Sequence, residues 1–196
     1  MQTATRNTQN PASPPLPVAT TNNILASAGE DHQYLTFNLA GEMYAVGILN
    51  VKEIIEYGHL TEIPMMPSFV RGVINLRGAV VPVIDLAARF GGSATTVQRR
   101  TCIVIVEILQ EDTKQDIGIM VDAVSEVLEI VAADIEAAPA FGAKIRTDFI
   151  AGMGKVNQKF VIILNIQKVL SVDEMAALSS AGNTSTAHGR ETTETA

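Results

Sequence analysis

The sequence contains few residues whose types and spacing could support catalysis. Its three histidines, His32, His59 and His188, are far apart, and none stands at metal-ligand spacing from another. Cys102 is the only cysteine, so the chain cannot form an internal disulfide or a thiolate zinc cluster. In the apolar run 101–106 it is expected to be a small buried residue with an unreactive thiol. The sequence therefore predicts no catalytic residues, no metal and no cofactor.

The most informative polar side chain is an arginine between two apolar runs. Asn75-Leu76-Arg77-Gly78 ends the run from Gly72 and precedes the run 79–84, which places Arg77 at the tip of a predicted β-hairpin. A guanidinium presents a planar fork of donors that suits a carboxylate, within the chain or on a partner. An exposed turn arginine without a specific role is the simpler alternative. Pro82 lacks an amide donor and is therefore expected at a sheet edge or a bulge.

Carboxylates are the remaining candidates for acid–base chemistry. In the first half of the chain these are Glu53, Glu56, Glu62 and Asp85, and for each a solvated surface position is the simpler interpretation. No Asp-Thr/Ser-Gly loop of the kind used by dyad proteases occurs. A small-molecule-binding or hydrolytic double β-barrel is kept as an alternative function, and a pocket with converging titratable groups would identify it.

The composition excludes two classes of partner. Lys plus Arg number 14 against 21 Asp plus Glu, which gives a net charge of -7 that would repel a nucleic-acid backbone. No apolar stretch approaches the roughly 20 residues that span a bilayer, and the N-terminus has no apolar signal segment. We therefore expect a cytoplasmic protein with no nucleic-acid partner and no direct membrane insertion.

The residues that could bind a partner must be positioned by a folded domain at 31–179. Residues 1–30 are rich in Thr, Asn, Pro and Ser and are predicted to be a disordered leader, and 180–196 a disordered tail. Between them the pattern is mostly strand, beginning with a hairpin over 34–46. The Ser-Val-Asp-Glu sequence at 171–174 is typical of a helix N-terminus and predicts a short C-terminal helix.

An internal repeat organises the folded part. Three segments recur in the same order, the first at an offset of 73 residues and the others at 80: Val51–Glu56 as Val124–Glu129, Phe69–Gly72 as Phe149–Gly152, and Val80–Leu86 as Phe160–Ile166. A duplication predicts two small antiparallel units, the first barrel at about 40–95 and the second at about 100–168. Each is near the size at which a lone barrel has a marginal core, so the two should share a central apolar layer and leave a groove at their junction.

Several of these segments together resemble the CheW family. The resemblance rests on the runs from Met43 to Glu56, from Gly72 to Leu86 and from Gly118 to Leu128, and on Pro139-Ala-Phe141. It covers approximately residues 33–178. It implies an all-β fold of two SH3-like five-stranded barrels that share a central core, with short helices, and with the strand 34–39 and the C-terminal helix completing the pair.

The resemblance also implies a function without catalysis. The chain is expected to be an adaptor that couples the cytoplasmic tips of methyl-accepting chemoreceptors to the regulatory domain of a CheA-type histidine kinase in bacterial chemotaxis. A coupling protein of a non-flagellar pathway that controls pili or biofilm is an alternative. The protein is expected to be a monomer in solution and to join receptor arrays at the membrane.

The family's receptor-binding side maps onto the first barrel. Arg77 and Glu53 match its charged pair, and Val51, Gly72 and Asn75 are expected to lie near them. These five residues are the predicted receptor-binding set.

The family's kinase-binding contact maps onto the second half of the chain. Phe141 matches an aromatic residue of that contact. Glu136 belongs to the same predicted contact and stands where some relatives carry a basic residue. A receptor face and a kinase face on one rigid body would bring the two partners together.

Overall fold

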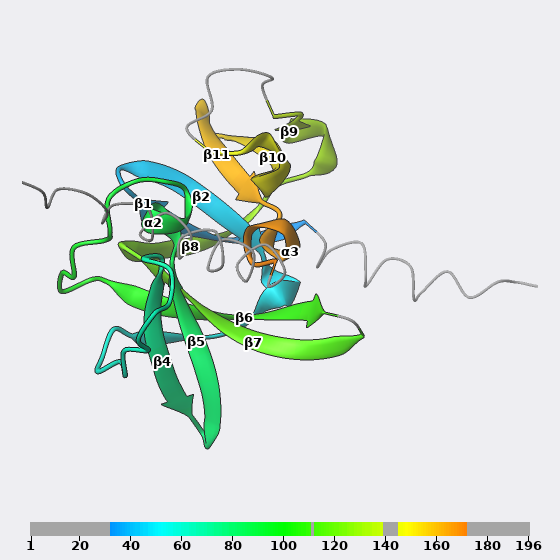
Figure 1. The fold of residues 1–196 in the computed structure, drawn as a ribbon. Coiled ribbons are helices and arrows are strands. Elements are labelled where there is room, and N and C mark those ends of the chain that lie inside the picture. Colours follow the sequence, from blue (N-terminus) through cyan, green and yellow to red (C-terminus); the bar gives the residue numbers. More distant parts are fainter. Residues whose placement is uncertain (1–31, 111, 139–144, 172–196) are drawn as a thin grey trace, which may run out of the picture.

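The computed structural model describes residues 32–110, 112–138 and 145–171. The chain forms eleven strands in two sheets within this part, together with short helices (Figure 1). The strands are β1 Gln33–Leu39, β2 Glu42–Gly47, β3 Val51–Glu56, β4 Val70–Leu76, β5 Ala79–Asp85, β6 Cys102–Gln110, β7 Thr113–Val121, β8 Ala123–Glu129, β9 Ile135–Glu136, β10 Ile150–Val156 and β11 Lys159–Leu164. The helices are the 3-10 turns η1 Ile48–Asn50, η2 Ala132–Asp134 and η3 Thr147–Phe149 and the short α-helices α2 Leu86–Arg89 and α3 Ile166–Val169.

The two sheets have the same strand order. One contains β3-β6-β7-β5-β4, and the other contains β8-β1-β2-β11-β10 with β9 added at the edge. Each has a single parallel pairing, β5 with β7 and β11 with β2, and its other pairings are antiparallel. The predicted all-β class is confirmed, and two small sheets of equal topology agree with a pair of SH3-like barrels.

The two sequence repeats exchange their first hairpins. The hairpin β1–β2 precedes β3–β5 in the chain but pairs with β8 and β11, whereas β6–β7 pairs with β3 and β5. The sheets therefore differ from the predicted division at 40–95 and 100–168, because β2 lies with the second unit and β6 and β7 lie with the first. A sequence repeat shows the order of similar segments, but it does not show which copy each segment pairs with.

Matching contacts in the two halves agree with the predicted duplication. The carbonyl of Phe69 accepts a 2.8 Å hydrogen bond from Asp85 N, and that of Phe149 accepts one from Asn165 N, also at 2.8 Å. Asp85 and Asn165 then cap α2 and α3 through their side chains. The recurrent Phe-x-x-Gly and Asp/Asn positions are thus explained by one local geometry that is used twice.

The apolar core is divided as the repeat predicted. The largest cluster joins both sheets, with Phe37 and Leu164 from one and Val104 and Ile119 from the other. One smaller cluster, which includes Met120, lies within the five-stranded sheet, and another lies within the six-stranded sheet. The shared cluster makes the two barrels a single folded unit.

Two expectations from the sequence concern Pro82 and the two ends of the chain. Pro82 lies in β5, which is an interior strand, and it stands next to no bulge in that strand. It is tolerated because the pairing of β5 with β7 begins only at Val83, so the missing amide proton falls outside that ladder. The predicted leader, tail and most of the C-terminal helix lie outside the described residues.

Candidate functional site

Arg77 and Glu53 form an ion pair at one end of the five-stranded sheet. Arg77 occupies the β4–β5 turn, and its Nη2 donates to Glu53 Oε2 of β3 at 2.8 Å. The two side chains differ in exposure, with 80% of the arginine and 24% of the glutamate accessible to solvent. Because β3 and β4 are the two edge strands of the sheet, this pair joins its edges and leaves a guanidinium largely free to bind a partner.

The backbone of Arg77 has a conformation that its residue type disfavours. Its φ is 53° and that of Gly78 is 91°, which is the left-handed pair of a tight hairpin turn. Asparagine and glycine suit such positions, whereas arginine has a steric cost there. The side chain of Asn75 supports the turn by accepting a 2.8 Å hydrogen bond from Gly78 N. An arginine kept in a strained turn indicates a role for its side chain.

Val51 and Gly72 lie close to this pair in sequence but have different surroundings. Val51 packs against the shared core, and a bulge between Val51 and Glu53 places the two side chains on opposite faces of the sheet, because they pair with the consecutive residues Val106 and Ile105. Gly72, near the start of β4, has a φ of 139°, and a Cβ at this position would come within 2.4 Å of the Thr61 carbonyl oxygen. That close approach allows Thr61 and Val73 to exchange backbone hydrogen bonds. Gly72 therefore positions the loop before β4, and it is not brought to the charged pair.

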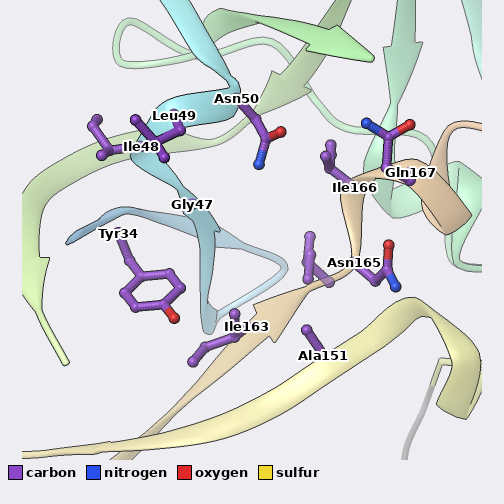
Figure 2. Close-up of a pocket in the computed structure, with 11 residues that line it drawn as sticks. Tyr34, Gly47, Ile48, Leu49, Asn50, Ala151, Ile163, Asn165, Ile166 and Gln167 are labelled. Carbon is purple, nitrogen blue, oxygen red and sulfur yellow. The ribbon is translucent and has the colours of Figure 1, made fainter. Parts of the chain in front are cut away.

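A pocket of about 320 Å³ lies beside the η1 turn, which precedes β3 in the chain (Figure 2). Its lining residues are Tyr34, Gly47, Ile48, Leu49, Asn50, Ala151, Ile163, Leu164, Asn165, Ile166 and Gln167. In Figure 2, Tyr34 lies on one side, and Asn165 and Gln167 lie on the other. Gln167 Oε1 also accepts a 3.3 Å hydrogen bond from Leu109 N. The pocket is lined by apolar side chains together with the amides of Asn50, Asn165 and Gln167, a composition suited to an amphipathic partner.

The predicted kinase contact is only partly described. Glu136 lies on β9, where its Oε1 accepts a 2.5 Å hydrogen bond from Lys155 Nζ of β10. The hydrogen bond with the Glu136 carboxylate raises the pKa of Lys155 above its ordinary value. Phe141 lies outside the described residues. The pairing of Lys155 with Glu136 depends on the strand register that brings β9 beside β10, and the sequence alone did not predict it.

Two groups of residues bear on the catalytic alternative, the possible metal ligands and Cys102. Within the ranges that the structure describes, no group of three His, Cys, Asp or Glu residues is placed to hold a metal ion. Cys102 is partly buried, and burial raises the pKa of its thiol above the ordinary value, which reduces its nucleophilicity. A search of the described helices found none long and apolar enough to cross a membrane.

The sequence of this chain is similar to those of known proteins. The family model described as "CheW-like domain" matches residues 33–174. The chain is 35% identical over 156 residues to the chemotaxis protein CheW of Klebsiella aerogenes, covering 80% of this chain and 92% of that protein. It is 34% identical over 155 residues to the chemotaxis protein CheW of Helicobacter pylori, covering 76% of this chain and 91% of the relative.

A solved structure gives the same result for the fold. The scaffolding protein TtCheW from Thermoanaerobacter tengcongensis superposes with a TM-score of 0.64 at 37% sequence identity. The match covers 71% of this chain and 87% of that one. Sequence and fold therefore agree on the same group of proteins.

Proposed function

Because the chain belongs to the CheW-like domain family, we propose that it is the adaptor that couples methyl-accepting chemoreceptors to a CheA-type histidine kinase in chemotaxis signalling. The relatives that support this are named chemotaxis proteins, and the solved neighbour is named a scaffolding protein. The adaptor makes and breaks no covalent bond. It acts by holding two partners in a fixed geometry.

The receptor docks at the Arg77–Glu53 end of the five-stranded sheet. The observation that carries this assignment is the pair itself, an arginine held at 2.8 Å from Glu53 in a strained turn and yet 80% exposed. Such a guanidinium can still donate to a carboxylate or a carbonyl on the receptor. Glu53 fixes the direction of the Arg77 guanidinium, which reduces the conformational entropy that the arginine side chain loses on binding.

An apolar contact complements the charged one. Leu49 lines the pocket in Figure 2, precedes β3 by two residues and is 62% exposed. A receptor tip is a helical hairpin, and an amphipathic helix binds by placing its apolar face in a groove. In this arrangement, Leu49 and the pocket receive the apolar side chains while Arg77 fixes the register of the helix.

The kinase regulatory domain docks on the second barrel, where Glu136 lies. The β4–β5 hairpin and the β10–β11 hairpin project from opposite ends of the molecule (Figure 1), so both partners can bind at once. Holding them on one rigid body raises their effective concentration for each other, by an amount that depends on geometry and requires no new contact between them. The adaptor is thereby recruited to receptor arrays.

Co-sedimentation of the full chain with receptor signalling fragments and kinase tests this proposal. The chain should sediment with receptor assemblies alone, bind the kinase alone, and bring additional kinase into the receptor pellet when all three are mixed. Analytical ultracentrifugation of the free chain should show a monomer. Failure to bind either partner, or turnover of a substrate by the purified chain, would contradict the assignment.

A further inference from the structure

A second, larger pocket lies where the two sheets meet. Its volume is about 660 Å³, which is within the range of small-molecule sites. The β1–β2 hairpin of the six-stranded sheet contributes Leu39 and Tyr44, and the segment 90–96, which follows β5 of the five-stranded sheet and α2, lines the pocket as well. Asp122, between β7 and β8, also lines it. This space is called here the junction pocket, and it agrees with the groove that the sequence repeat predicted between the two units.

The hydroxyl of Tyr44 opens into the junction pocket without a hydrogen-bond partner. The residue is only 6% exposed, and its ring packs between those of Phe37 and Phe90, with centroids 6.1 and 5.8 Å away. Within the described ranges, no hydrogen bond involves this hydroxyl, and no side-chain oxygen is fully buried without a partner. The hydroxyl must therefore reach solvent, and the junction pocket is the space that Tyr44 lines. A polar group in this position is satisfied by water or by a ligand.

The charge around the junction pocket selects against anions. Asp122 is the single charged side chain among the described residues that line it. Its Oδ2 accepts a 2.8 Å hydrogen bond from Ala40 N, whereas in the described part of the chain Oδ1 accepts none and no cation pairs with the carboxylate. Burial and then the charge of Glu42 raise the pKa of Tyr44, and the second cause shows that the potential at its hydroxyl is negative. A cation with hydrogen-bond donors, such as an ammonium group, is the complementary ligand.

The polar segment 93–98 is held in place by the fold itself. Thr95 is 7% exposed, and its amide and its hydroxyl both donate to the buried carboxylate of Asp85, at 2.7 and 2.9 Å. Gln98 N donates to Thr101 Oγ1 at 2.8 Å, which anchors the other end of the segment. This wall of the junction pocket is therefore formed before a ligand binds, which lowers the entropic cost of binding.

We propose that the junction pocket binds a small organic amine with an aromatic body. The ammonium group binds Asp122, the Tyr44 hydroxyl forms a hydrogen bond with the ligand, and the aromatic ring lies against Phe90. Contacts between aromatic rings, and between an ammonium group and a ring, favour this class over an aliphatic amine. Because the pocket is lined from both sheets, an occupant stabilises the folded unit by mass action. The inference goes beyond the proposed function, since it requires neither the receptor nor the kinase.

Binding of a defined probe tests the inference. Amide NMR spectra of the full chain are recorded during titration with phenethylamine, with its neutral analogue 2-phenylethanol and with the phenylacetate anion. Phenethylamine should bind saturably, with a dissociation constant of about 1 mM or lower, and should shift the amides of residues that line the junction pocket. The alcohol should bind at least about tenfold more weakly, because it lacks the charge-assisted hydrogen bond, and the anion should not bind in the same concentration range.

Two substitutions that preserve side-chain shape identify the site. Tyr44→Phe removes a hydroxyl that the fold does not use, so the protein should stay folded while its affinity for phenethylamine falls about fivefold. Asp122→Asn removes the charge, keeps an acceptor for Ala40 N, and should lower the affinity at least about tenfold. Tyr57→Phe and Asp134→Asn, which lie outside the junction pocket, are the matched controls and should bind phenethylamine as the wild type does.

The contrary outcomes are distinct. The inference would be overturned by a folded wild type that does not bind phenethylamine saturably, by binding of phenylacetate as tight as that of phenethylamine, or by unchanged affinity in Tyr44→Phe or Asp122→Asn. Displacement of phenethylamine by the receptor fragment or the kinase domain would identify a partner side chain as the occupant and overturn the small-molecule assignment. Co-sedimentation with receptor and kinase is measured separately, so failure of the amine site leaves the adaptor function standing.

Discussion

Arg77 Nη2 lies 2.8 Å from Glu53 Oε2, and this contact joins the two edge strands of the five-stranded sheet. The residues are 24 positions apart in the chain, so only the closure of the barrel brings them together.

Reversing one charge of the pair should weaken receptor coupling without unfolding the protein. Arg77→Glu places two carboxylates side by side and should weaken receptor binding at least about tenfold, whereas an exposed ion pair contributes at most about 1 kcal/mol to the free energy of unfolding. Glu53→Arg should behave alike, and the double charge swap should recover part of the binding. A pull-down with receptor fragment measures all three; normal capture by Arg77→Glu would count against the receptor assignment.

Arg77→Asn should separate stability from function. Asparagine tolerates a φ of 53°, so the free energy of unfolding should rise by about 0.5–1 kcal/mol while receptor binding falls. Asn157 has a φ of 49° at the equivalent position of the other hairpin, and Asn157→Arg is the matched control. That variant should lose a similar amount of stability and keep receptor binding. Denaturant titrations with parallel binding measurements give the comparison; unchanged stability in both variants would show that the turn is not strained.

Gly72 and Gly78 should respond differently to alanine. A Cβ on Gly72 would meet backbone at 2.4 Å in addition to its positive φ, so Gly72→Ala should lower the free energy of unfolding by about 3 kcal/mol or more. A Cβ on Gly78 meets nothing within 4 Å, so Gly78→Ala should cost only about 1 kcal/mol. Chemical unfolding checks both values. Equal losses would show that the contact with Thr61 does not explain the glycine.

Cys102 should react slowly in the native protein. Burial raises the pKa of its thiol, and the backbone hydrogen bond at Val124 only partly opposes this shift. A raised pKa means less thiolate at a given pH, so labelling by a disulfide reagent near pH 8 should be slower in the native state than in guanidinium chloride. The native rate should continue to increase at higher pH. Equal native and denatured rates would contradict this burial.

The elements of this fold follow closely from local sequence patterns. The hairpins over 34–46 and around Arg77 occur where the sequence predicted them, and Asp85 ends β5 by capping α2. These features depend on neighbours in the chain, which is why the sequence alone can indicate them. Of the repeated segment 160–166, only the part up to Leu164 is a strand, because Asn165 caps α3.

Features that depend on which strands pair with each other could not be predicted from the sequence. The exchange of hairpins between repeats leaves the order of segments unchanged, so no alignment of the halves can show it. The pairing of Lys155 with Glu136 depends on β9, a strand of only two residues with no periodic pattern to predict it. The receptor and kinase roles of the named residues remain predictions for the experiments above.

The crossed hairpins also suggest how one chain came to serve two partners. A half-length chain with this topology would lack its own inner strands and would need to obtain them from an identical copy, which would make it a symmetric dimer. Joining the genes end to end freed the two outer loops from having the same sequence. One loop could then carry an arginine against a glutamate while the other acquired a lysine and a phenylalanine, and a symmetrical object became one with two distinguishable ends.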